Sequence, residues 1–254
     1  MNPDDDITFL QNKLQLIRSL QDPGEKEISG LVSLLTDPSE NEIICASVYP
    51  VLQAAGQLSV DALLSVYSNF SEFDEKIQIR LSYTFSQIPE TPAFVFETFL
   101  KSGISRVRQN GIIGFALLND RRFDDLLFDV LRNDADSETA YEAAIALSGG
   151  GVDVLSEFEI ILKENVMAEN LREKTYMDSP TKINADNTNG LCSPESDLFH
   201  PLDKHVLAKV IEITGDIGNE ETLSYLTAYL THPDERVSRI AAESIQKIKT
   251  KTTK

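Results

Sequence analysis

The sequence VSRIAAESI at residues 237–245 has apolar or small side chains at its first, fifth, sixth and ninth positions. In an α-helix of 3.6 residues per turn, these positions lie on one face. The same pattern occurs in five earlier blocks, ICASVYPVL (44–52), IQIRLSYTF (77–85), VRQNGIIGF (107–115), TAYEAAIAL (139–147) and VLAKVIEIT (206–214). Successive blocks start 33, 30, 32, 67 and 31 residues apart. A period of about 31 residues is typical of stacked helical hairpins, none of which can bury its apolar face alone.

A second amphipathic segment precedes each block, so each repeat is expected to be a pair of helices. These first-helix segments are 27–36, 59–69, 91–101, 121–132, 152–164 and 219–231. The turn residues Asp37-Pro38-Ser39-Glu40 and His232-Pro233-Asp234-Glu235 combine proline with acceptor side chains, as helix starts do. Within the last block, the register places Ala242 and Ile245 in the core.

Residues 3–20 form a further amphipathic segment, with Asp4, Asp5 and Asp6 at its amino end. We interpret it as a cap over the open face of the first repeat, since an uncovered terminal face would aggregate. The sequence therefore predicts an all-α fold of about thirteen helices without strands. Residues 1–254 are expected to form one solenoid, a right-handed α-α superhelix of about six hairpins behind an N-terminal capping helix.

One spacing breaks the repeat, because 67 residues separate Thr139 from Val206. Subtracting one period leaves about 36 extra residues, and these fall at 166–201, within the fifth repeat. The segment is rich in Asn, Ser, Asp and Pro. Its first part, 166–176, can continue the preceding helix, whereas a mobile loop is predicted beyond Met177.

Charge and composition restrict the classes of partner. The net charge is −18 and the isoelectric point is near 4.5, which argues against nucleic acid and anionic membranes. The start MNPDDDITFL lacks the pattern of a secretory signal, and no stretch approaches eighteen apolar residues. The two cysteines, Cys45 and Cys192, fit a reducing compartment better than a disulfide framework. We therefore expect a cytoplasmic protein that is a monomer when free.

The stretches GDIGNEETLSYLTAYL (215–230) and HPDERVSRIAAESIQKI (232–248) resemble the HEAT repeat. More narrowly, they are similar to its short bacterial and archaeal form, which also occurs in phycobilisome lyases. The resemblance is strongest in the last repeat and looser at 44–52, where Pro50 interrupts the second helix. It implies a right-handed α-solenoid whose second helices line a concave face, and a role as scaffold or adaptor. Fold alone does not settle function.

Enzymes with HEAT repeats provide alternatives. The deoxyhypusine hydroxylases hold two irons with His-Glu pairs, but none of His200, His205 and His232 is followed by Glu. The HEAT-like DNA glycosylases need a basic, aromatic-lined cleft, whereas this chain is acidic and has no Trp. A phycobilisome-type bilin lyase, or a chaperone subunit acting on a chromophore protein, stays open on family similarity alone. We expect the chain not to be an enzyme.

No cofactor or metal site is predicted. Cys192, His200 and His205 lack the paired two-to-four-residue spacing of zinc ligands. The run Gly149-Gly150-Gly151 follows a predicted helix and lacks the Lys-Ser/Thr of a phosphate-binding loop after it. We therefore interpret it as the end of that helix and a tight turn. Gly111 is expected at a close helix approach, while Gly114 can face either a packed helix or a ligand.

A strip of cationic and polar side chains in the central repeats is the candidate site for a protein partner. Arg106 and Arg108 lie on a helix without acids, and Arg80 and Lys76 lie on the preceding second helix. Arg108 follows the first apolar position of its block, where HEAT repeats often keep an Arg that pairs with acids of adjacent turns, so the resemblance also implies a structural role for it. Because these side chains lie outside the expected core positions, the strip can bind an acidic or polar group through charge-assisted hydrogen bonds. Its predicted partner-binding residues are Arg80, Tyr83, Arg106, Gln109 and Asn110.

Overall fold

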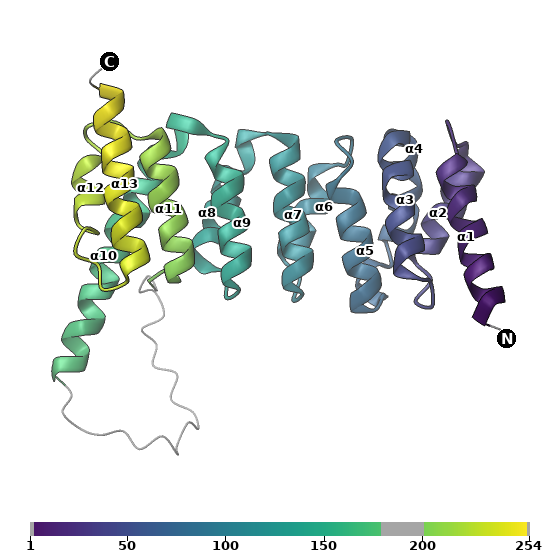
Figure 1. Ribbon diagram of the computed structural model, residues 1–254, viewed down its shortest axis with the longest axis horizontal. Coiled ribbons are helices and arrows are strands. Elements are labelled where there is room, and N and C mark those ends of the chain that lie inside the picture. Colours follow the sequence, from purple (N-terminus) through teal and green to yellow (C-terminus); the bar gives the residue numbers. More distant parts are fainter. Residues whose placement is uncertain (1–2, 179–200, 253–254) are drawn as a thin grey trace. The chain divides into compact units, whose positions relative to one another are not determined.

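The computed structural model describes residues 3–178 and 201–252 (Figure 1). Every regular element in these residues is helical, with thirteen α-helices, three short 3-10 helices and no strand. The predicted all-α fold is therefore confirmed. The chain divides into two compact units, Met1–Phe123 and Asp124–Lys254.

The first unit is built from a two-layer stack of helices (Figure 1). Its α-helices are α1 (Pro3–Ser19), α2 (Glu25–Leu35), α3 (Glu42–Ala55), α4 (Gln57–Tyr67), α5 (Glu75–Ser86), α6 (Ala93–Leu100) and α7 (Ser105–Leu118). The helices α1, α3, α5 and α7 are neighbours in one layer, and α2, α4 and α6 pack behind them. The 3-10 helices η1 (Phe70–Glu72) and η2 (Arg121–Phe123) complete the unit.

The second unit repeats this arrangement. It contains α8 (Asp124–Asn133), α9 (Ser137–Ser148), η3 (Gly151–Val154), α10 (Leu155–Asp178), α11 (Lys204–Ile217), α12 (Leu223–Thr227) and α13 (Glu235–Thr252). Helix α11 packs between α9 and α13, and α10 contacts α12. Across the described residues of both units, the helices of each pair are in contact in α2/α3, α4/α5, α6/α7, α8/α9, α10/α11 and α12/α13.

The apolar blocks form the core of both units. The first, fifth and ninth positions are buried in all six blocks. The sixth position is also buried at Ser82, Ile112, Ala144 and Ile211.

The sixth position is exposed at Ala242, so its expected burial is wrong, whereas Ile245 is buried as expected. Helix α13 packs on α11 and α12, and no helix follows it in the described chain. Its buried face is therefore narrower and turns Ala241 and Ser244 inward, where the Ser244 hydroxyl donates to the Ile211 carbonyl at 3.2 Å.

Two predicted helix starts have different outcomes. Asp234 caps α13 by accepting from the backbone N–H groups of Arg236 and Val237, as its sequence suggested. At the other turn, Asp37 accepts from both the N–H and the hydroxyl of Ser39, which closes a local turn rather than a helix. Helix α3 begins later, with Asn41 as its N-cap.

Part of the long insertion is helical. Helix α10 runs to Asp178, so the expected continuation through 166–176 is present. The loop predicted beyond Met177 falls mainly on residues 179–200, which lie outside the described part of the chain. Where the described chain resumes at residue 201, the N–H of Leu202 donates to the side-chain oxygen of Asn165 on α10 at 2.7 Å. Among the described residues, no helix is long and apolar enough to cross a membrane.

The register of α13 predicts that enlarging two adjacent alanines has different effects on stability. Ala241 is fully buried, so Ala241→Phe should overpack the α11–α13 contact and lower the free energy of unfolding by about 1–3 kcal/mol. Ala242→Phe is the matched control and should stay within about 0.5 kcal/mol of wild type, because position 242 is exposed. Urea unfolding followed by circular dichroism measures both, and equal effects would contradict the register.

Candidate binding surface of the first unit

Arg80 lies inside the first unit rather than on a binding surface. Its side chain is 2% exposed, although it extends from the middle of α5 toward the turn before α3. The guanidinium donates to the backbone carbonyls of Asp37 and Glu40, both at 2.9 Å, and to the Glu42 carboxylate at 2.7 and 3.3 Å. All of these acceptors belong to the preceding hairpin. Arg80 therefore fastens one hairpin to the next.

Glu42 is the solvent-facing member of this pair. Hydrogen bonds from Arg80 and then from Lys76, whose Nζ lies 2.9 Å from Oε1, lower the pKa of the Glu42 carboxyl below its ordinary value of 4.5. The Glu42 side chain is 59% exposed, so water screens much of this attraction. The hydrogen bonds to the two backbone carbonyls, which are uncharged acceptors, depend less on this screening and are the more important part of the connection.

The neighbouring aromatic residues are packed against one another. Tyr83 on α5 is half-buried and meets Tyr49 on α3 edge-on, with ring centroids 4.8 Å apart. Burial raises the pKa of Tyr49 to about 12. This pair continues the contact between α3 and α5 and leaves one side of Tyr83 open to solvent.

The polar residues predicted on α7 divide into one exposed and two buried side chains. Arg106 is exposed and donates to Gln109 Oε1 at 2.9 Å, while Gln109 itself is 8% exposed. Asn110 is fully buried and donates to the Ser82 hydroxyl on α5 at 2.8 Å. Arg108 donates to the Ser102 carbonyl, in the turn before α7, at 2.9 Å.

The expectation that five residues stand outside the core is therefore wrong for Arg80, Gln109 and Asn110. Arg80 donates to the turn before α3, Gln109 accepts from Arg106, and the Asn110 amide nitrogen donates to Ser82. The Asn110 side-chain oxygen is buried and has no hydrogen-bond partner within the described residues. Arg106 is at the surface, and Tyr83 is partly so.

The two glycines of α7 allow close helix packing. A Cβ at Gly111 would lie 3.0 Å from Phe99 Cβ and 3.2 Å from the Phe96 carbonyl, both on α6. A Cβ at Gly114 would overlap the Phe96 ring. Gly111 therefore has the close approach expected of it, and Gly114 faces a packed helix rather than a ligand.

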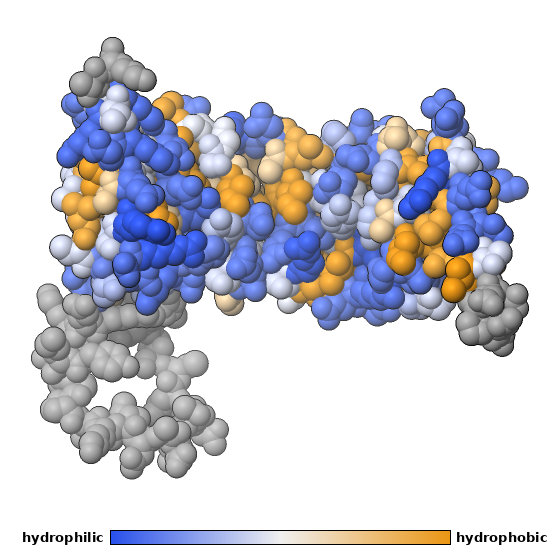
Figure 2. Space-filling model, viewed as in Figure 1, coloured by the Kyte–Doolittle hydropathy of each residue, from blue (hydrophilic) through white to orange (hydrophobic). Residues whose placement is uncertain are grey.

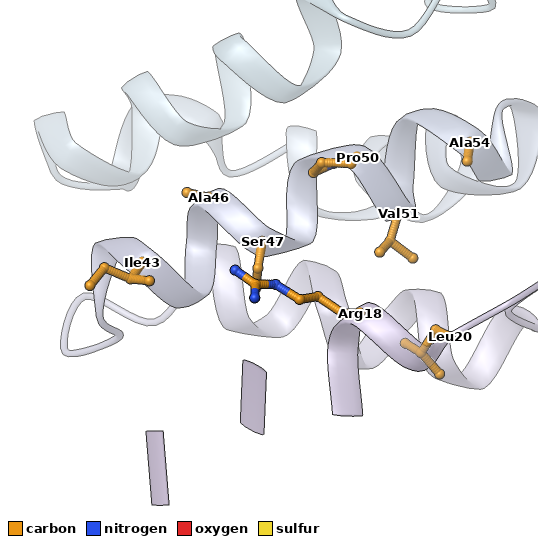
Figure 3. A pocket seen from close by; sticks show the side chains of 8 residues that line it. All are labelled: Arg18, Leu20, Ile43, Ala46, Ser47, Pro50, Val51 and Ala54. Atoms are coloured by element: carbon orange, nitrogen blue, oxygen red, sulfur yellow. The ribbon is translucent and has the colours of Figure 1, made fainter. Parts of the chain in front are cut away.

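A groove between α1 and α3 offers more accessible surface (Figure 3). Its volume is about 480 Å³ and it is open to solvent. From α3 its walls carry apolar and small side chains, and Ile43 at one end is 54% exposed. Figure 2 shows hydrophobic surface over α1 and α3 among hydrophilic areas. The lining residues are Arg18, Leu20, Ile43, Ala46, Ser47, Pro50, Val51 and Ala54.

Two polar groups stand at this apolar groove. The Arg18 side chain reaches from α1 toward Ser47 on α3, as Figure 3 shows. It is exposed and makes no hydrogen bond or ion pair with the side chains that the structure describes. Pro50 lies inside α3 and has no N–H, so it cannot donate the usual helical hydrogen bond to the Ala46 carbonyl. The groove thus combines an exposed cation with the apolar and small side chains of α3.

Sequence reasoning missed this groove, although a signal for it exists. Ile43, Ser47, Pro50 and Ala54 follow the spacing i, i+4, i+7 and i+11, which defines one stripe on a helix. This stripe lies beside the block's core positions, and its proline was interpreted only as an interruption. Whether α1 covers this stripe depends on how α1 and α3 pack, which the pattern of α3 alone does not specify.

The second unit holds the remaining candidate ligands. His205 on α11 stacks on Tyr141 of α9, with ring centroids 4.3 Å apart, and Lys209 lies over the same ring. Lys209 also pairs with Glu212 at 2.7 Å. Cys192 and His200 lie outside the described residues. Within the part of the chain that is described, no group of three or more His, Cys, Asp or Glu side chains could hold a metal ion.

Comparison with known proteins provides little further information. No protein-family model matches the sequence, and no curated protein matches it. Among solved structures, a crystal structure of an engineered protein is 15% identical to this chain. The alignment covers 94% of this chain and 97% of the engineered one, with a TM-score of 0.43. A likeness at this level supports no conclusion about function.

The buried position of Arg80 predicts a stability role. Arg80→Met keeps most of the side-chain volume but leaves the Glu40 carbonyl without its donor, whereas the Asp37 carbonyl keeps the hydrogen bond from the Glu40 N–H at 3.2 Å. An unsatisfied group costs roughly 1–3 kcal/mol, so we expect a loss of about 1–3 kcal/mol in the free energy of unfolding. The matched control is Arg18→Met, at an exposed arginine with no hydrogen bond or ion pair among the described side chains, and it should change this free energy by less than about 0.5 kcal/mol. Urea unfolding at pH 7 measures the free energy of unfolding of both variants. An Arg80→Met variant as stable as wild type would contradict the role of Arg80 in joining the two hairpins.

The lowered pKa of Glu42 predicts the sign of a pH dependence. Because the folded-state pKa lies below the ordinary value of 4.5, the carboxylate stabilises the fold above that pH. This contribution is lost as the pH falls through the folded-state pKa. Glu42→Gln should therefore be less stable than wild type at pH 7, and the difference should shrink in acid. Unfolding free energies measured from pH 7 to 3 test this, and a constant difference would contradict it.

Proposed function

We propose that this protein is a non-catalytic scaffold or adaptor that binds a protein partner. In this proposal the chain is a HEAT-like α-solenoid, a right-handed superhelix of about six hairpins behind the cap α1. The partner contacts the layer of second helices, to which α3, α5 and α7 belong in the first unit. The protein itself is a monomer when free.

The repeated hairpins support this proposal. In six consecutive helix pairs, the first, fifth and ninth positions of the nine-residue block are buried. The residues at these positions range in size from glycine to phenylalanine. In such an array the buried positions are constrained, whereas the residues on the outer surface of each row of helices can differ from repeat to repeat. Binding to a row of this kind needs no catalytic group.

The open groove between α1 and α3 is the observation that carries the proposal. It lies on the second-helix layer, and its walls expose apolar side chains such as Ile43 and Pro50 to solvent. An exposed apolar groove with few polar groups is a common feature of protein-binding surfaces. Tyr83 and Arg106 expose further surface on the same layer, and they are the two residues of the predicted strip that remain available.

Site-specific photo-crosslinking tests this function. A photoreactive residue is placed at Ala46 on α3 or Leu117 on α7, both exposed, and the full chain is exposed to native lysate. Controls carry the same group at Ser29 on α2 or Thr98 on α6, which are exposed on the other layer. We expect one defined protein to be trapped from the second-helix layer and not from the controls. Absence of any trapped protein, or equal trapping from both layers, would contradict the proposal.

A further inference from the structure

We infer that the groove between α1 and α3 is the receptor for a single amphipathic helix of a partner protein. The bound helix presents apolar side chains at three- and four-residue spacing, together with one carboxylate that pairs with Arg18. This inference rests on the proposed function and adds the place and the chemistry of the contact.

The dimensions of the groove fit a helix. Its lining on α3 extends from Ile43 to Ala54, a length of about 16 Å at 1.5 Å per residue, or three helical turns. Ala46, Ser47 and Ala54 are small, so they leave room for the backbone of a second helix to approach. Apolar side chains spaced i, i+3, i+4 and i+7 on the incoming helix would follow the same three turns.

Charge complementarity specifies the carboxylate. Arg18 is the one charged side chain among the eight that line the groove, and it has no partner among the described side chains. A guanidinium beside an apolar wall is well suited to a carboxylate, because both groups gain a charge-assisted hydrogen bond. The protein carries a net charge of −18, so a uniformly acidic helix would be repelled. The expected ligand therefore has one acid facing Arg18 and a neutral or basic outer face.

The cap explains why a receptor forms here. Ile17 precedes Val48 by 31 residues, and both are buried, so α1 occupies the register of a second helix. It has no first helix of its own in the described chain, and it leaves one flank of α3 uncovered. An incoming helix would cover this flank.

A displayed peptide library supplies the probe, since the natural ligand is unidentified. The library consists of 16-residue helical peptides with a randomised face, and it is selected on the immobilised full chain. Selected peptides should share apolar residues at i, i+4 and i+7 and one Asp or Glu at a constant position. Selection without a preferred acid, or of a non-helical motif, would overturn the inference.

Two substitutions locate the contact. Ala46→Arg introduces a long cation into the groove and should weaken binding of the selected peptide at least tenfold. Ala116→Arg is the matched control, since Ala116 is an exposed alanine on α7 in the same layer, and it should bind like wild type. Equal binding by both variants would place the contact elsewhere. Circular dichroism confirms that each variant is folded.

Charge reversal then tests the ion pair. Arg18→Glu should weaken binding about tenfold or more, and a peptide with Lys in place of its acid should bind this variant better than wild type. Failure of this rescue would exclude the proposed carboxylate contact. Sedimentation supplies a further check, because dimerisation that Ala46→Arg abolishes would show that a second copy, rather than a partner helix, fills the groove.

The two proposals fail in different ways. If a partner is trapped from the second-helix layer but Ala46→Arg and Arg18→Glu leave its capture unchanged, the scaffold function holds and the groove inference is wrong. If no partner is trapped from either layer, the proposed function itself is wrong. A peptide that binds the groove with the expected acid supports the inference directly.

Discussion

The apolar face of each helical hairpin must be covered by its neighbours, and the rest of the structure depends on this constraint. A hairpin of about 30 residues has too little interior to enclose its own large side chains. Leu81 on α5 and Val48 on α3 are fully buried because each helix lies in a row with the next. The constraint acts within each unit and sets the spacing of the blocks, whereas the close approach at Gly111 lies between the two helices of one hairpin, α6 and α7.

The same stacking explains the unusual environment of Arg80. A turn between two helices has carbonyl groups that no helix satisfies, and the adjoining hairpin buries them. The guanidinium reaches the carbonyls of Asp37 and Glu40 from α5, and it keeps Glu42 at the solvent edge. An arginine in a mostly acidic protein can thus serve the contact between hairpins rather than the recognition of a ligand.

Accessible apolar surface appears where the stacking is incomplete. Helix α1 packs on α3 as a single helix, so the stripe from Ile43 to Ala54 is only partly covered. Pro50 belongs to this stripe and lines the open groove, and its missing N–H removes one hydrogen bond of α3. The feature that weakens one helix is therefore also part of an accessible apolar groove of the first unit.

The sequence by itself determined the helical class, the six hairpin pairs and most of the buried positions, because apolar periodicity depends on local helix geometry. It also indicated the close approach at Gly111 and the extension of α10. Tertiary structure alone decided that Arg80 and Asn110 are internal, that Ala242 is exposed, and that α1 leaves a groove. Each of these outcomes depends on which carbonyl, hydroxyl or helix stands opposite a residue. Such neighbours are distant in sequence, and the periodicity of a single helix does not specify them.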